Sequence, residues 1–199
     1  PDGSTSVVDV SEKLAKKMEA ARTQIEQVWR AAARRSGSRY DTPEARRAGL
    51  EGVAVLIRRA AKKDNLPLLK RTLLAALSYF GADREADAAP KVTAPELLNT
   101  GNVNRKTALH FAAQNAGPNM VRFLLRYGAH VNAHCTRGQT PICFAIAKRR
   151  YRNAEVLLEA GASLLVRTVL GETPLELAIA HVAPLLSLIH ISEPTRPNE

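Results

Sequence analysis

Five residues of the two types that most often bind zinc lie within 34 positions: His110, His130, His134, Cys135 and Cys143. A zinc finger combines a C-x-x-C pair with an H-x-x-x-H pair, so that each pair holds the ion from one turn of backbone. Seven residues separate the two cysteines here, so this combination is absent. The sequence therefore predicts no metal site and no other cofactor.

Catalytic motifs are also missing. The chain has no G-x-S-x-G, P-loop or Rossmann glycine pattern, and its carboxylates are spaced as helix-surface charges rather than as an acid and base pair. We therefore expect a protein that is not an enzyme. One alternative is that this chain regulates an enzyme whose catalytic domain lies outside the sequence given.

Basic residues provide a stronger signal. The chain carries a formal net charge of +10, and residues 101–170 contain ten Lys and Arg against only Glu155 and Glu159. The densest basic cluster consists of Lys148, Arg149, Arg150 and Arg152. A clustered positive field favours an acidic partner protein, whereas the plain interpretation is a solvated face. Nucleic acid or anionic lipid is a third alternative, although no base-reading aromatic motif accompanies the charges.

A repeat of 33 residues organises the second half of the chain. TALHFAAQN begins at Thr107, TPICFAIAK at Thr140 and TPLELAIAH at Thr173. The same shift aligns alanines, leucine pairs and glycines, namely Ala112 with Ala145 and Ala178, Leu124-Leu125 with Leu157-Leu158, and Gly128 with Gly161. A fixed period of this length indicates stacked units, none of which buries its apolar face alone. We expect the four leucines to form a continuous apolar seam between units.

NRKTALHFAAQNAGPNMVRFLLRYGAHVNA resembles the ankyrin repeat, and so does RGQTPICFAIAKRRYRNAEVLLEAGASLLV. The resemblance covers about residues 102–181, in copies at 102–134, 135–167 and a truncated 168–185. It implies an all-α solenoid in which each copy supplies a hairpin and two helices. It also implies a non-catalytic protein-binding module whose partner meets the concave face. Matching positions imply these contacts: Asn104, Lys106, Gln114, Asn115, Thr136, Arg137, Gln139, Lys148, Glu172 and His181.

Departures from the family pattern predict weak points. The histidine of the T-P-L-H pattern is present as His110 but replaced by Cys143 and Glu176, which predicts a less stable stack. Arg105 stands where the later hairpins have glycine. In the turn between the two helices of a copy, Ala116 and Arg149 replace the usual glycine, and we expect strain there.

Residues 1–83 are predicted to form a separate helical segment, with helices at about 9–35, 43–63 and 66–80. Residues 56–83 are either a divergent repeat or a plain helical hairpin that caps the array. Residues 84–101 are predicted to be a linker, with one short helical turn at 94–98. The apolar stripe that ends at Trp29 predicts a first helix packed on its neighbours, and a helical binding partner is the alternative.

The remaining features concern location and the chain ends. Only two cysteines occur and no run reaches the roughly 18 apolar residues of a membrane span, so we expect an intracellular protein of the cytoplasm or nucleus. LSLIHISEPTR, residues 186–196, resembles a translated sequencing-library adaptor, so 186–199 are expected to be an artefact. The truncated third copy predicts that the chain is marginally stable or self-associates.

Overall fold

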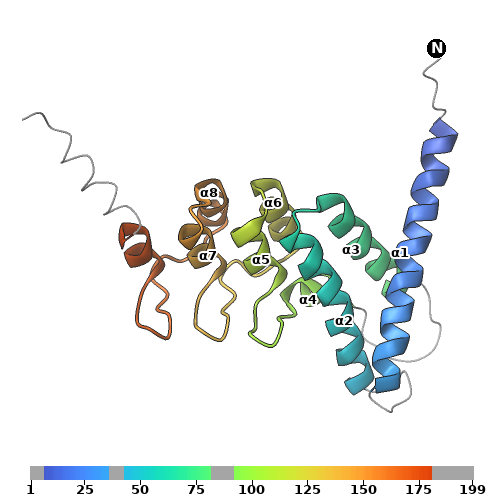
Figure 1. Cartoon of the computed structure of the whole chain (residues 1–199), viewed down its shortest axis with the longest axis horizontal. Helices are drawn as coiled ribbons and strands as arrows, with labels where there is room; N and C mark the ends of the chain where they lie inside the picture. The colour runs from blue at the N-terminus through green and yellow to red at the C-terminus, as the bar shows by residue number, and fades with distance from the viewer. Residues whose placement is uncertain (1–6, 36–42, 82–91, 181–199) are drawn as a thin grey trace, which may run out of the picture.

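A computed structural model describes residues 7–35, 43–81 and 92–180 of the chain. Three helices come first: α1 (Val7–Arg35), α2 (Pro43–Lys62) and α3 (Leu66–Gly81). All three agree closely with the predicted helices. Figure 1 shows α1 at one end of the molecule, alongside α2.

A glycine in α2 makes the contact with α1 possible. A β-carbon at Gly49 would lie 1.9 Å from the indole ring of Trp29, so only glycine leaves room for this ring between the helices. Trp29, Ile25 and Ala21 lie on one side of α1 and are buried against the bundle. The apolar stripe of α1 is therefore covered by its own neighbours over this part, as its amphipathic pattern predicts.

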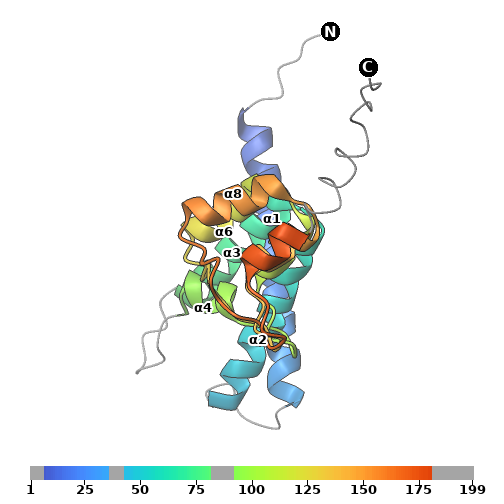
Figure 2. The same ribbon diagram turned by 90° about the vertical axis from the view of Figure 1, so that its left-hand side faces the viewer.

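The repeats follow after the short helix α4 (Ala94–Asn99). The first copy supplies α5 (Ala108–Asn115) and α6 (Pro118–Arg126), and the second supplies α7 (Pro141–Ala147) and α8 (Tyr151–Glu159). Residues 174–180 form the first helix of the third copy. Successive helix pairs stand side by side with their hairpins on one side of the row, and Figure 2 looks along this row from its carboxyl end. The described residues thus form an all-α helical stack.

Local chemistry explains where these helices begin. Thr107 and Thr140 occupy the N-cap positions of α5 and α7 in extended backbone. Pro118 and Pro141 stand at the first helical position, where a missing N–H costs nothing and the fixed φ suits the helix. The start of each helix is therefore encoded within a few residues of sequence.

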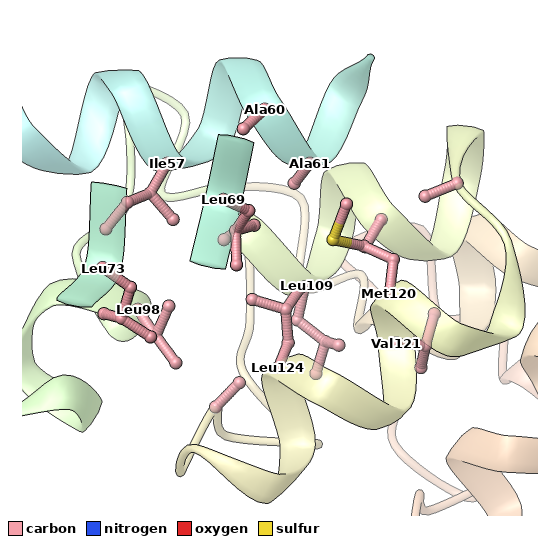
Figure 3. Close-up of a cluster of buried hydrophobic side chains, with 14 of the residues drawn as sticks. Ile57, Ala60, Ala61, Leu69, Leu73, Leu98, Leu109, Met120, Val121 and Leu124 are labelled. Atoms are coloured by element: carbon pink, nitrogen blue, oxygen red, sulfur yellow. The ribbon is translucent and has the colours of Figure 1, made fainter. Parts of the chain in front are cut away.

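Small and apolar side chains join the helices into one core. Ala112 and Ala145 are fully buried where α5 meets its neighbours α2 and α7, and alanine lets these helices approach closely. Figure 3 shows side chains from α2, α3, α5 and α6 meeting in a shared interior, among them Ile57, Leu69, Leu109 and Leu124. Because α2 and α3 share this core with the repeats, the amino-terminal helices and the stack are continuous.

The predicted leucine seam is only partly correct. Leu124 and Leu157 are fully buried, and Leu125 is half-buried. Leu158, however, is 45% exposed. It lies on the last complete helix pair that the structure describes and faces a groove at the end of the stack, which is why it lacks the cover that Leu125 has.

Two asparagines one repeat apart fasten the loops that follow the second helices. Asn99 donates from Nδ2 to the carbonyl of Gly128 at 3.0 Å and accepts the N–H of His130 at 2.7 Å. Asn132 makes the same pair of bonds with Gly161 and Ser163 at 3.2 and 2.9 Å. Residue 99, within the predicted linker, is thus tied into the stack.

The residues of the predicted linker divide into two parts. Residues 84–91 lie outside the described residues. In α4, Leu97 and Leu98 are fully buried, so this short helix belongs to the core rather than to a solvated connection.

Backbone strain is found at one of the two predicted turn positions. Arg149 has φ 55°, in the left-handed region that costs a side chain about 1 kcal/mol or more. Ala116 has φ −95° and ψ 172°, an ordinary extended conformation, so the expectation of strain there is wrong. The chain enters α6 at Pro118 through an extended Gly117 and needs no left-handed residue at this turn. Arg105, at the glycine position of the first hairpin, is also left-handed, with φ 56°.

The turn between α2 and α3 closes like the turn between α7 and α8. Asn65 N–H donates to the carbonyl of Ala60 at 3.0 Å, and Arg150 N–H donates to the carbonyl of Ala145 at 2.8 Å. The residue before each donor is left-handed, Asp64 in the first turn and Arg149 in the second. This likeness favours the divergent-repeat interpretation of residues 56–83, which stays a prediction.

A membrane-spanning helix is absent from residues 7–35, 43–81 and 92–180, where no helix combines the necessary length and hydrophobicity.

Candidate protein-binding surface

Three hairpins with one backbone pattern precede the first helices of the copies. The residue pairs 102 and 106, 135 and 139, and 168 and 172 each join through one N–H···O bond of 2.9 to 3.1 Å. Neighbouring hairpins are also bonded to each other, because Thr136 N–H donates to the carbonyl of Asn104 and Val169 N–H to the carbonyl of Arg137, both at 3.0 Å. The hairpins therefore form a row of fixed spacing, visible below the helices in Figure 1.

The structure places the predicted contact residues in three situations. Five are exposed, namely Asn104, Thr136, Arg137, Lys148 and Glu172. Four are half-buried, namely Lys106, Gln114, Asn115 and Gln139. His181 lies outside the described residues. The hairpin row brings together the residues at 104–106, 136–139 and 172, while Lys148 and Asn115 lie at the opposite ends of their helices.

Lys106 rests on an aromatic ring of the next copy. Its Nζ lies 4.5 Å from the centre of the Phe144 ring, and the ring of His110 meets Phe144 edge-on at 5.5 Å between ring centres. A cation over an aromatic face gains roughly 0.5–1 kcal/mol at an exposed site and loses freedom of movement. Lys106 is thus a positioned charge beside the hairpins.

Two of the predicted contacts also serve the fold. Asn115 donates from Nδ2 to the carbonyl of Phe111 at 3.1 Å, which extends the hydrogen bonding of α5 at its last turn. The carbonyl of Gln139 accepts the N–H of Cys135 at 3.0 Å within its hairpin. Changes at Asn115 would therefore disturb α5 as well as any bound partner.

His110 links the first copy to the second. Thr107 N–H donates to its Nδ1 at 3.1 Å, which leaves the proton on Nε2, and Nε2–H donates to the carbonyl of Gln139 at 3.2 Å. Burial lowers the pKa of His110 to about 4, against the opposing effect of its bond to Gln139. His110 is consequently neutral at pH 7 and bonds the first copy to the second.

Cys143 and Glu176 replace this histidine in the second and third copies. Each contacts the threonine three residues before it, as His110 contacts Thr107. In the second copy Cys143 Sγ lies 3.5 Å from Thr140 Oγ1, a weak contact within the same turn. In the third, Glu176 accepts the N–H of Thr173 at 2.7 Å. This bond and a second one with the Thr173 side chain lower the pKa of the Glu176 carboxyl. Within the described residues, Cys143 makes no bond to the next copy like the one from His110 to Gln139, and the lower stability predicted from this substitution stays a prediction.

The basic cluster Lys148, Arg149, Arg150 and Arg152 occupies the turn between α7 and α8, and all four side chains are exposed. Because α7 runs from the hairpin to this turn, its seven residues separate the cluster from Arg137 by roughly 10 Å along the helix axis. The hairpin charges and the cluster are thus two distinct basic surfaces.

A family model of ankyrin repeats in three copies matches residues 51–168, more than half of the chain. The chain belongs to the ankyrin-repeat family. Ankyrin repeats are generally protein-interaction modules and are typically non-catalytic. The match begins in α2, so it takes in residues ahead of the regular repeats found from the sequence.

Curated relatives share the ankyrin repeats over part of their length. Palmitoyltransferase ZDHHC13 of Homo sapiens is 35% identical over 91 residues, which are 45% of this chain and 15% of that protein. A putative ankyrin repeat protein of Rickettsia bellii is 41% identical over 49 residues, 25% of this chain and 29% of that protein. The putative E3 ubiquitin-protein ligase XBAT31 of Arabidopsis thaliana is 29% identical over 137 residues, 63% of this chain and 30% of that protein. The chain spans less than a third of each relative's length.

The sequence assigned no role in binding or in stacking to three residues that the structure places at or between the hairpins and helices of the copies. Arg105 is exposed at the tip of the first hairpin, and its place at a glycine position was the available signal. Phe144 supports Lys106 from the next copy, a contact without any local signal. Buried Asn153 of α8 donates from Nδ2 to three carbonyls at the end of α5, those of Ala112, Ala113 and Ala116, at 3.4, 3.1 and 2.8 Å. Asn153 thereby bonds one ankyrin copy to the next.

The structure does not bring the three histidines and two cysteines between residues 110 and 143 together into one cluster. Cys135 and Cys143 are free and buried, and no three His, Cys, Asp or Glu side chains in the described ranges are placed to share a metal ion.

Proposed function

We propose that the chain binds an acidic segment of a partner protein along its hairpin row. The observation that carries this proposal is the charge of the row, where Arg105, Lys106 and Arg137 stand on two adjacent hairpins and Glu172 is the acidic residue of the third. A surface of one sign attracts and orients a partner of the opposite sign.

Fixed geometry supports the same proposal. The backbone bonds between hairpins hold the tips at a constant spacing before any partner arrives, and Phe144 holds the ammonium group of Lys106. Binding then costs less conformational entropy than it would on unrestrained loops. The row is thus suited to an extended segment that meets several tips at once.

The contact residues divide into a centre and a periphery in this proposal. Arg105, Lys106 and Arg137 form the centre. The exposed Asn104, Thr136 and Glu172 surround it, together with the polar side chain of Gln139, while Gln114 lies at the far end of α5. Lys148 belongs to the separate basic cluster and makes a second, weaker contact with longer partners.

Fluorescence anisotropy with a labelled acidic peptide, built from Glu, Asp and interspersed Leu, tests the proposal. Arg137→Glu should weaken binding about tenfold or more, because a charge reversal at the centre replaces attraction with repulsion. Arg126→Glu on α6 makes the same charge change away from the hairpins and should leave affinity within about twofold. Melting temperatures of both variants should stay close to wild type.

Two outcomes would contradict the proposal. Equal loss of binding in Arg137→Glu and Arg126→Glu would show that net charge, not the hairpin row, attracts the peptide. Tighter binding of a single-stranded oligonucleotide or of phosphatidylserine vesicles than of the peptide, with a steep salt dependence, would favour nucleic acid or anionic lipid instead.

A further inference from the structure

Exposed apolar side chains collect at the carboxyl end of the stack. Of the ten large apolar side chains that are exposed in the described ranges, seven lie between residues 151 and 179. Val169 and Leu170 lie on the third hairpin, and the other five are Tyr151, Leu158, Leu165, Leu175 and Ile179. A concentration of this kind marks an interaction surface rather than ordinary scattered exposure.

The same end is hollowed. A groove of about 700 Å³ runs between α8 and the helix at 174–180, and this end faces the viewer in Figure 2. We call it the end groove. Its apolar lining comes mainly from Ile142, Ile146, Leu158, Leu164, Leu175 and Ala178. Its polar lining consists of charged side chains of α8, together with Tyr151 at the start of that helix.

The charges of α8 are divided along the helix. Arg152 lies in its first turn, and the basic Arg149 and Arg150 come directly before the helix. Glu155 is the middle residue of α8 and Glu159 is its last, and both line the end groove with Arg152. Neither carboxylate forms a hydrogen bond or an ion pair with a residue that the structure describes.

A helix that is basic at its start and acidic at its end complements a copy of itself that runs the opposite way. Two parallel copies would place Arg152 beside Arg152 and Glu159 beside Glu159. Two antiparallel copies place Arg152 near the start of each helix beside Glu159 at the end of the other, and a two-fold axis generates this arrangement. The apolar lining would be covered in both copies at once.

We propose that two copies of the chain associate through their end grooves, with the α8 helices antiparallel about a two-fold axis. This surface is separate from the hairpin row, and the proposal does not depend on partner binding there. The apolar side chains at 158, 175 and 179 supply the driving force, since each leaves water on association. Arg152 of each copy, beside Glu159 of the other, sets the orientation.

Sedimentation velocity on the full chain, from micromolar to sub-millimolar concentration at about 0.15 M salt, tests the proposal. Wild type should change reversibly from one chain to two as concentration rises. Arg152→Glu makes the charged lining entirely acidic, and Glu155→Arg with Glu159→Arg makes it entirely basic. Each variant alone should dimerise at least about tenfold more weakly, because like charges then meet.

An equimolar mixture of the two variants is the decisive sample. Each charged contact in the mixed pair joins an entirely acidic lining to an entirely basic one, so a one-to-one dimer at least as tight as wild type should return. A misfolded variant would not restore association, so the mixture separates lost charge pairing from lost folding. Glu12→Arg with Glu19→Arg on α1 introduces the same charge change away from the groove and should leave dimerisation unchanged.

Three results would overturn the proposal. A wild-type chain that stays monomeric throughout the range would show that another segment or partner covers the groove. Open-ended aggregation in place of a dimer would exclude a closed two-fold contact. A wild-type dimer that neither variant weakens, or a mixture that fails to pair, would exclude the antiparallel α8 arrangement.

Discussion

At the scale of single residues, the buried ring of His110 gives the stability of the repeats a dependence on pH. Its ring is 1% exposed, and it donates to one copy while accepting from another. Lys106 and His134 lie close enough to oppose a positive charge on the ring. Protonation therefore has a cost in the folded state that it does not have in the unfolded chain.

Acidification should destabilise the chain through His110. Its folded pKa of about 4 is below the unfolded value of 6.5, so its contribution is fully present above pH 6.5 and is lost as pH falls toward 4. Between pH 7.5 and 4.5 the loss should be about 2–3 kcal/mol. Urea unfolding at both pH values measures it, and His110→Gln, although less stable at pH 7.5, should lose less on acidification. Equal losses in the two proteins would contradict this role.

Arg149 offers a gain in stability. Because its φ of 55° suits glycine, Arg149→Gly should raise the free energy of unfolding by about 0.5–1 kcal/mol. Arg150→Gly, at φ −85° and with a side-chain bond to the carbonyl of Asn115, should lower it instead. Thermal unfolding of both variants gives the comparison, and a stability loss in Arg149→Gly would show that its side chain matters more than its backbone.

Residue-scale predictions succeeded in part where the repeat supplied a template. The resemblance to the family pattern predicted strain at Arg149 correctly, but the same reasoning was wrong at Ala116. The contact of Lys106 with Phe144 was not predicted, since the two residues are 38 positions apart and only stacking brings them together. The proposed hairpin contacts depend on such long-range placement, and five of the ten predicted residues are exposed.

At the scale of elements, the packing of α1 against α2 depends on glycine at position 49, which has no β-carbon. Gly49→Ala would place a β-carbon 1.9 Å from the ring of Trp29, so α1 must move or tilt. The expected cost is about 2–3 kcal/mol. Trp29 is the chain's single tryptophan, so its fluorescence should shift to the red as the ring becomes exposed. Gly49→Ala combined with Trp29→Leu should lose less than the two single changes added together, and strict additivity would refute the steric account.

Asn153 holds α8 against α5. Asn153→Ala leaves three carbonyls at the end of α5 without their side-chain donor, and it should cost about 2–3 kcal/mol. Asn119→Ala on α6, at an exposed position, should cost less than about 0.5 kcal/mol. Urea unfolding of the pair tests the claim. A similar effect of both changes would mean that these bonds add little.

Helix starts and the role of α4 illustrate what sequence does and does not specify at this scale. Thr107, Thr140 and Pro141 are local signals and were enough to place α5 and α7. Leu97 and Leu98 lie in a stretch interpreted as a linker, because six residues of helix give no periodicity to recognise. Their burial is decided by helices elsewhere in the chain that α4 contacts, α2 and α5.

At the scale of the whole molecule, stability should fall along the stack toward residue 180. α5 has neighbours on both sides, α2 and α7, whereas the helix at 174–180 has exposed Leu175 and Ile179. Amide hydrogen exchange, at concentrations too low for association, should show the strongest protection in α2 and α5 and the weakest in 174–180. Uniform protection from α5 to residue 180 would contradict this gradient.

The stacked architecture was the most predictable feature. A period of 33 fixes which residues face which, because each copy repeats the contacts of the one before. The N-terminal helices share the core with the copies through Ile57 and Leu69. No periodic pattern in the sequence predicted this shared core. The end groove and the opposite charges at the two ends of α8 could be recognised only from the structure, because the groove is formed between α8 and the helix at 174–180.

The hairpin row has a consequence for how this surface can change over generations. Its tips are spaced by main-chain bonds, Thr136 to Asn104 and Val169 to Arg137, which any non-proline residue can make. Under the proposed function, substitutions at the tips would therefore leave the scaffold intact and change what it binds. New specificities can arise in such a chain by point mutation alone, without an intermediate that fails to fold.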